Sequence, residues 1–332
     1  MFIEMPRKII PVLGSTNPEV IQSLYNITIP TAFNGNIQAV ASFLGQYYSP
    51  SDLTDFENLF GLPIVPIAQT FGPNDETDPG VEASLDVQYL LGVSNCTTET
   101  WVISTPNMTP SGNEPFLTFL VGLDNLTSIP YLISMSYQDL EYSVSEKYAN
   151  VVNQEFMAYS LQGTTFITGS GDWGVGCEVV GQCSTFTADF PSSSPYVVST
   201  GATTFDNTGL EEGVSFSSGG FSNYFARPSF QDDAINAYLS QSNLPPSSYF
   251  NSSGRGFPDV AAIGTGFVVY TNGVHTPVGG TSASTPTFGS MLSMINTMRL
   301  SSNKPVLGYV LPFIYEAWGT NPSAFNGMFN MK

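Results

Sequence analysis

The segment "IPYLISMSY", residues 129–137, gives the clearest indication of the fold. Its isoleucines, tyrosines and leucine favour a β-strand, and most of its positions are apolar instead of alternating with polar ones. A strand of this kind is typical of a sheet that is covered on both faces. The segment therefore predicts a buried, parallel central sheet.

Other stretches along the chain extend this interpretation. Four more are rich in β-branched and aromatic residues and are bounded by Gly, Pro or Asn: residues 62–71, 100–106, 164–171 and 195–205. Helix candidates lie between them near 82–92, 114–124 and 143–161. This alternation predicts an α/β fold, a three-layer domain with a mainly parallel central sheet and right-handed crossovers.

The remaining organisation is simple. Residues 206–256 are rich in Gly, Ser, Asn and Pro, which predicts a long irregular excursion over the surface. The sequence contains no internal repeat and no clear linker, so we expect a single domain over residues 1–332.

Composition excludes some classes of function. The chain of 332 residues is 42% hydrophobic, which suffices for a large core, and carries 8 basic against 27 acidic residues. Its formal charge of −19 repels phosphate backbones and anionic lipids, so nucleic-acid binding is not expected. Protonation of Asp and Glu near pH 4 to 5 would relieve the self-repulsion, which favours an acidic working environment.

Several features indicate the secretory route. Five glycosylation sequons begin at Asn26, Asn95, Asn107, Asn125 and Asn251. Cys177 and Cys183 bracket a short loop and are the candidate disulfide, which would leave Cys96 free; three buried thiols are the alternative. No apolar run reaches 18 residues, so membrane insertion is not expected, and the first residues lack the apolar region of a signal peptide. We expect a lysosomal or secreted protein whose targeting segment is not in this chain.

The stretch "VGGTSASTPTFGSML", residues 278–292, contains a candidate nucleophile. Ser282 would lie at the start of a helix, where backbone N–H groups and the helix dipole favour developing negative charge. An ordinary Ser/Thr N-cap is the alternative for so short a motif. A serine nucleophile needs a base, and His275, the only histidine, is just seven residues earlier in a turn-like segment, so we expect a different base.

Acidic residues are the candidates for that base. Glu82 and Asp86 in "DPGVEASLDVQYLL" would share one face of a helix, about 6 Å apart; an alternating strand would place them about 13 Å apart. Ala, Leu and the preceding Asp-Pro favour the helix. Asp172 follows an apolar strand and a Gly-Ser-Gly turn, which is typical of sites at the edge of α/β sheets and also of an Asx-turn.

Taken together, these motifs resemble the pattern of a known family. Glu82-x-x-x-Asp86, Ser-Gly-Asp172 and Gly-Thr-Ser282-Ala-Ser-x-Pro286 occur in the order found in the sedolisins, the serine-carboxyl peptidases with a subtilisin-like fold. The resemblance covers about residues 12–326, and the flanking sequences are most similar to the tripeptidyl-peptidase members. It implies an acid-acting peptidase that releases N-terminal tripeptides from polypeptides.

The resemblance also implies residue roles. Ser282 would attack the scissile carbonyl, Glu82 would accept its proton, Asp86 would orient Glu82, and a protonated Asp172 would donate to the oxyanion. Ser136 and Tyr137 match the family's substrate-aligning strand. Asp139 matches a nearby acid of the tripeptidyl-peptidase members.

The chain departs from the family pattern at several positions. Gly279 replaces the usual serine, and Gln138 stands where glycine is usual and would crowd the cleft. The family implies bound Ca²⁺, but Gly327 replaces its first acidic ligand and the Gly-rich calcium segment is missing, as is the prosegment, so no metal ligands are assigned. An impaired paralogue that binds peptides without efficient cleavage is the alternative function. A secreted adhesion module would leave the acids and the serine unexplained.

Overall fold

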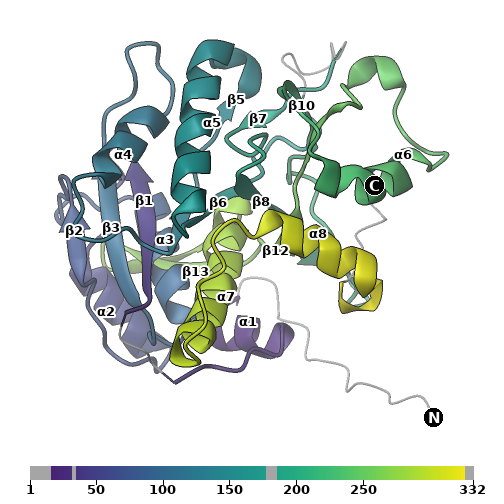
Figure 1. Cartoon of the computed structure of the whole chain (residues 1–332). Helices are drawn as coiled ribbons and strands as arrows, with labels where there is room; N and C mark the ends of the chain where they lie inside the picture. The colour runs from purple at the N-terminus through teal and green to yellow at the C-terminus, as the bar shows by residue number, and fades with distance from the viewer. Residues whose placement is uncertain (1–15, 32–34, 177–184, 326–332) are drawn as a thin grey trace.

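The computed structural model describes residues 16–31, 35–176 and 185–325. Its centre is an eight-stranded sheet in the order β12-β8-β6-β4-β1-β3-β2, with β9 paired to β8 (Figure 1). All neighbours on the main path are parallel, and only β9 is antiparallel. The strands are β1 Ile37–Phe43, β2 Gln69–Phe71, β3 Glu99–Thr105, β4 Leu132–Met135, β6 Thr165–Gly169, β8 Val197–Phe205, β9 Glu211–Gly213 and β12 Val260–Ile263.

Helices cover both faces of this sheet (Figure 1). Along β1, Ala39, Ala41 and Phe43 pack in a core with α4 and α5, while Val40 points to the opposite core with α3 and α7. Both cores consist of aromatic and aliphatic side chains, which explains why several strands are apolar at successive positions. The helices are α1 Pro18–Leu24, α2 Pro50–Leu59, α3 Val81–Gly92, α4 Phe116–Leu123, α5 Glu146–Leu161, α6 Asp232–Leu239, α7 Thr281–Ser301 and α8 Leu311–Thr320.

Three small antiparallel pairs complete the architecture. They are β5 Asp139–Leu140 with β7 Asp189–Phe190, β10 Gly220–Ala226 with β11 Gly254–Phe257, and β13 Phe267–Thr271 with β14 Val274–Val278. The predicted α/β class with a parallel central sheet is therefore confirmed. In the described parts of the chain, no helix is long and apolar enough to cross a membrane.

Two predictions about elements were wrong. The strand predicted over 62–71 is limited to β2 Gln69–Phe71, because Pro63 and Pro66 have no N–H group to donate to a neighbouring strand. The region 206–256 is not an irregular excursion. It contains β9, which pairs with the nearby end of β8, α6, and β10 and the beginning of β11, which pair with each other across more than 25 residues.

Candidate active site

Helix α3 carries the two acids of the predicted catalytic pair. Residues 81–92 are helical, so the alternative strand interpretation is wrong, and Glu82 and Asp86 share a face one turn apart. Gly80 precedes the helix in an extended conformation, directly after the Asp-Pro signal. Asp86 is completely buried, and Glu82 is partly buried in the first turn.

Ser136, just after β4, connects this acid pair to the predicted nucleophile. Its hydroxyl donates to Asp86 Oδ1 at 2.6 Å and lies 3.4 Å from the carbonyl oxygen of Ser282. Ser282 is the second residue of α7, which packs along α3. Ser136 is therefore hydrogen-bonded to the acid pair and lies within reach of the Ser282 backbone.

A proline explains why the Ser282 carbonyl can take part in this contact. Pro286 lies inside α7 and has no N–H to donate to the carbonyl four residues earlier, which is that of Ser282. The proline thus frees an acceptor at the start of the helix, and Ser136 is positioned against it.

The two carboxyl groups are held in environments that favour protonation. Burial raises the pKa of Glu82 to about 7, with a further increase from the charge of Asp172, while hydrogen bonding with the Ser282 and Ser136 side chains lowers it. Burial and the charge of Glu82 raise the pKa of Asp86 well above its usual range. Glu82 Oε1 and Asp86 Oδ2 are buried and have no hydrogen-bond partner among the described residues. A close pair of this kind retains a proton at acidic pH.

Asp172 reaches the same place from the turn after β6. Its Oδ1 accepts hydrogen bonds from the Thr281 N–H at 2.7 Å and the Thr281 hydroxyl at 2.9 Å. A Cβ atom on Gly280 would lie only 2.8 Å from Asp172 Oδ2, so glycine is needed for this close approach. Asp172 is thereby fixed at the N-terminus of α7, beside Ser282, with its side chain open to solvent.

The other predicted substrate-binding residues take different places. The Tyr137 ring is buried in the core, 4.8 Å from the Phe43 ring between centroids, so only its backbone can face a substrate. Asp139 begins β5 and accepts a hydrogen bond from the Glu114 N–H at 2.9 Å. Gln138 does not extend freely into a cleft, because its amide donates to Thr168 Oγ1 at 3.2 Å. His275 lies exposed on β14, as expected for a residue outside the site.

Two buried acids near the site were missed in the sequence. Burial, together with the charge of Asp139, raises the pKa of Glu114 to about 8. Burial also raises the pKa of Asp189 to about 7, and the charges of Asp172 and Glu141 add to this. Glu114-Pro115 before a helix reads as an ordinary helix start, and Asp189 belongs to a two-residue strand that only tertiary pairing creates.

The predicted modification and metal sites are only partly within the described residues. Cys177, Cys183 and Gly327 lie outside them, while Cys96 is a buried free thiol beside Glu57. Of the sequon asparagines, Asn95 is half-buried and the others, Asn26, Asn107, Asn125 and Asn251, are exposed. The ranges 16–31, 35–176 and 185–325 contain no group of three or more His, Cys, Asp or Glu side chains able to hold a metal. Calcium binding therefore stays a prediction.

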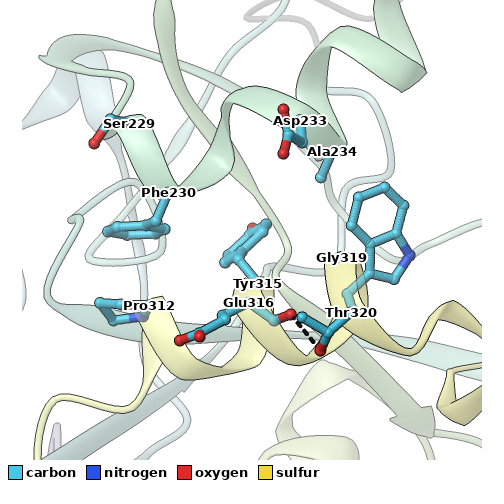
Figure 2. Close-up of a pocket in the computed structure, with 10 residues that line it drawn as sticks. Ser229, Phe230, Asp233, Ala234, Pro312, Tyr315, Glu316, Gly319 and Thr320 are labelled. Carbon is cyan, nitrogen blue, oxygen red and sulfur yellow. Dashed lines mark hydrogen bonds between the residues drawn. The ribbon is translucent and has the colours of Figure 1, made fainter.

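A separate pocket lies between the segment around Phe230 and helix α8 (Figure 2). Its walls include Tyr315, Asp233 and Glu316. None of the predicted catalytic residues lines it, so it forms no part of the site described above.

Comparisons with known proteins show which proteins the chain is similar to in sequence. The chain is 45% identical over 319 residues to tripeptidyl-peptidase 1 of Mus musculus, covering 93% of this chain and 56% of that protein. The Homo sapiens protein of the same name is 45% identical over 318 residues, covering 92% of this chain and 56% of its own length. This chain thus spans about half the length of the curated relatives it matches.

Solved structures agree on the fold. Pseudomonas sedolisin, a serine-carboxyl proteinase solved with pseudo-iodotyrostatin, matches with a TM-score of 0.73 at 21% identity, over 94% of this chain and 88% of its own. A psychrophilic protease matches less closely, with a TM-score of 0.55 at 14% identity over 92% of this chain and 89% of its own. A scan against protein-family models gives no match. The chain is thus similar in sequence to tripeptidyl-peptidase 1 over most of its own length, and it shares the fold of Pseudomonas sedolisin.

Proposed function

We propose that this chain is an acid-acting serine-carboxyl peptidase that releases tripeptides from the free N-termini of polypeptides. The observation that carries the proposal is the meeting of the Glu82–Asp86 pair on α3 with Ser282 and Asp172 at the start of α7. The proposed product length of three residues is supported by the name of the similar proteins, tripeptidyl-peptidase 1.

In the proposed mechanism, the Ser282 hydroxyl attacks the carbonyl carbon of the scissile bond while Glu82 accepts its proton. Asp86, hydrogen-bonded to Ser136, shares charge and proton with Glu82 and keeps it oriented. A protonated Asp172 donates a hydrogen bond to the tetrahedral oxyanion. Glu82 then gives its proton to the leaving amine, and water hydrolyses the acyl-enzyme by the same steps with the same residues.

Acidic pH follows from these roles. Asp172 donates only when it is protonated, and the buried acid pair retains a proton to near-neutral pH. The excess of 27 acidic over 8 basic residues and the exposed sequons support an acidic compartment on the secretory route, with the lysosome as the proposed location.

Hydrolysis of a tripeptide amide of a fluorescent amine, followed from pH 3 to 7, tests the function. We expect activity below neutral pH in the purified chain, and a loss of about a thousandfold or more in kcat/KM for Ser282→Ala and for Glu82→Gln. Ser301→Ala, exposed at the far end of α7, is the matched control and should retain full activity. Undiminished hydrolysis by either catalytic variant would sink the mechanism, and a folded wild-type chain without activity would sink the function.

A further inference from the structure

Asp189 lies beside the turn that carries Asp172. It belongs to the short strand β7, is only 4% exposed, and is paired in register with Leu140 of β5. Its carboxyl group reaches the backbone of the turn, because a Cβ atom on Gly171 would lie only 2.6 Å from Asp189 Oδ2. The φ angle of Gly171 is +105°, so glycine serves both the backbone conformation and the close approach of the acid.

Ser218 connects Asp189 to the chain on both sides of Asp172. Its hydroxyl is hydrogen-bonded to the Asp189 carboxyl group and accepts a hydrogen bond from the Trp173 N–H at 3.1 Å. The Ser218 N–H donates to the Gly171 carbonyl oxygen at 2.8 Å. Ser218 is only 2% exposed, so bulk water has little access to these bonds. The residues directly before and after Asp172 are therefore held by one serine, whose hydroxyl is oriented by Asp189.

Helix α7 holds Asp172 from the other side. Besides donating to Asp172 Oδ1, the Thr281 hydroxyl accepts a hydrogen bond from the Gly171 N–H at 3.2 Å. The side chain of Asp172 is thus fixed by α7, and its backbone by Ser218 and Asp189. A hydrogen bond from Asp172 to an oxyanion needs both supports, because such bonds weaken steeply when donor and acceptor are misaligned.

Asp189 can orient Ser218 without carrying a charge. Burial is the main reason that the pKa of Asp189 is raised to about 7, with smaller increases from the charges of Asp172 and Glu141. The carboxyl group is therefore protonated at the acidic pH of the proposed reaction. A neutral carboxyl group still has an oxygen that accepts the Ser218 hydrogen bond. Asparagine carries the same acceptor in the same shape, whereas alanine does not.

We propose that Asp189 is a positioning residue for peptide hydrolysis, which through Ser218 holds the backbone around Asp172 so that the Asp172 carboxyl group meets the oxyanion. The proposal rests on the peptidase function proposed above. Because the oxyanion exists only after the nucleophile has attacked, loss of Asp189 affects the transition state more than substrate binding.

Hydrolysis of the fluorescent tripeptide amide at acidic pH tests the positioning role. Asp189→Ala and Ser218→Ala should each lower kcat about tenfold or more and leave KM within about twofold. Asp189→Asn, which keeps the acceptor, should retain kcat within about threefold of the wild-type value. Glu57→Ala removes another buried acid, on α2, whose carboxyl group accepts the Val65 N–H. It is the matched control and should leave both constants unchanged.

A double-mutant cycle separates action through Asp172 from a general loss of structure. In a chain that already carries Asp172→Ala, adding Asp189→Ala should lower kcat by less than about twofold, because the carboxyl group that Asp189 positions is gone. A full additional loss in that chain would overturn the proposal. So would an unchanged kcat for Asp189→Ala alone, or an asparagine variant as impaired as the alanine variant.

Hydrogen exchange followed by mass spectrometry measures the same contacts without hydrolysis. The Trp173 N–H is bonded to Ser218, so Asp189→Ala should speed exchange in residues 171–174 about tenfold and leave the middle of α7 unchanged. Exchange as slow as in the wild-type chain would refute the role of Asp189 even in an active peptidase. An inactive wild-type chain that shows the expected increase would refute the peptidase function and support the positioning of Asp172 by Asp189.

Discussion

The two oxygens of Asp172 have different surroundings. Oδ1 accepts both hydrogen bonds from Thr281, and Oδ2 lies against Gly280, where no side chain intervenes. This arrangement leaves Oδ2 as the oxygen that can carry a proton toward an oxyanion. Asparagine could replace Asp172 in part, because its side chain has nearly the same shape and carries one acceptor, the carbonyl oxygen, and one donor group, the NH₂.

Asp172→Asn should therefore retain more activity than Asp172→Ala, for which we expect a loss of about a hundred- to a thousandfold in kcat. The charge of Asp172 contributes to the raised pKa of Glu82. The asparagine variant lacks this charge at every pH, so wherever wild-type Asp172 is ionised the variant should ionise Glu82 at lower pH, and the limb of the pH–rate profile that reports Glu82 should move downward. A pH–rate profile of both variants is the measurement, and an upward or absent shift with asparagine would contradict this electrostatic link.

Residue-level sequence reasoning singled out the acids and the serine that the fold brings together, because each belongs to a short local motif. It gave no signal for Glu114 or Asp189. The pKa values of these side chains are raised by burial and by the charges of neighbours that are distant in sequence, such as Asp139 for Glu114. The roles of all these residues in catalysis stay predictions.

At the scale of elements, the backbone hydrogen-bond ladder of helix α7 is interrupted near its start. Pro286 lies six residues into the helix and releases the Ser282 carbonyl, which Ser136 approaches. An unbroken helix would hold that carbonyl in its own hydrogen-bond ladder. The imperfect helix thus couples the Ser282 backbone to the residue that follows β4.

Pro286→Ala would restore the missing N–H. We expect the helix to become more stable, since proline in a helix interior costs about 3 kcal/mol, while kcat falls roughly three- to tenfold as the Ser136 contact is lost. Thermal unfolding and steady-state kinetics on the same preparation would check both. Parallel losses of stability and activity would show instead that the proline is needed for packing.

An element could be predicted from the sequence where a local sequence pattern favours it, and not where its strand partner is distant. The apolar strands that became β3, β4, β6 and β8 were recognisable, because burial on both faces leaves continuous apolar runs. Strand β1 was missed although it is central, since "IQAVASF" mixes Ala, Gln and Ser with its apolar residues. Helices α1, α2 and α8 and the hairpin of β13 and β14 were also missed, and in β10 and β11 the pairing comes from partners outside any local window.

At the scale of the whole molecule, the buried carboxyls tie stability to pH. Glu82 and Asp189 have pKa values of about 7 and Glu114 of about 8, against about 4 in an unfolded chain. The folded state binds these protons more tightly, so the stabilisation is fully present below about pH 4 and is lost as pH rises through 7 to 8. The net charge of −19 adds repulsion in the same direction.

We therefore expect Tm to fall by roughly 5 °C or more between pH 5 and pH 8. Asp189→Asn removes one of the groups with a raised pKa and should reduce this difference, mostly by raising Tm at pH 8. Differential scanning calorimetry at both pH values would measure it. A Tm that stays constant or rises toward pH 8 would contradict the burial-induced shifts.

The packing of α3 against α7 has a consequence for the stage of synthesis and folding at which the proposed site is assembled. Glu82 and Ser282 are 200 positions apart in the sequence, so the contact between their helices is of long range and is expected to form late in folding. A ribosome-bound fragment that lacks α7 does not contain Ser282, the proposed nucleophile. A collapsed chain whose strands have not yet paired does not hold Glu82, the proposed base, near Ser282. Hydrolytic competence would thus arise in one late step, which shields the nascent polypeptide and its neighbours from premature cleavage.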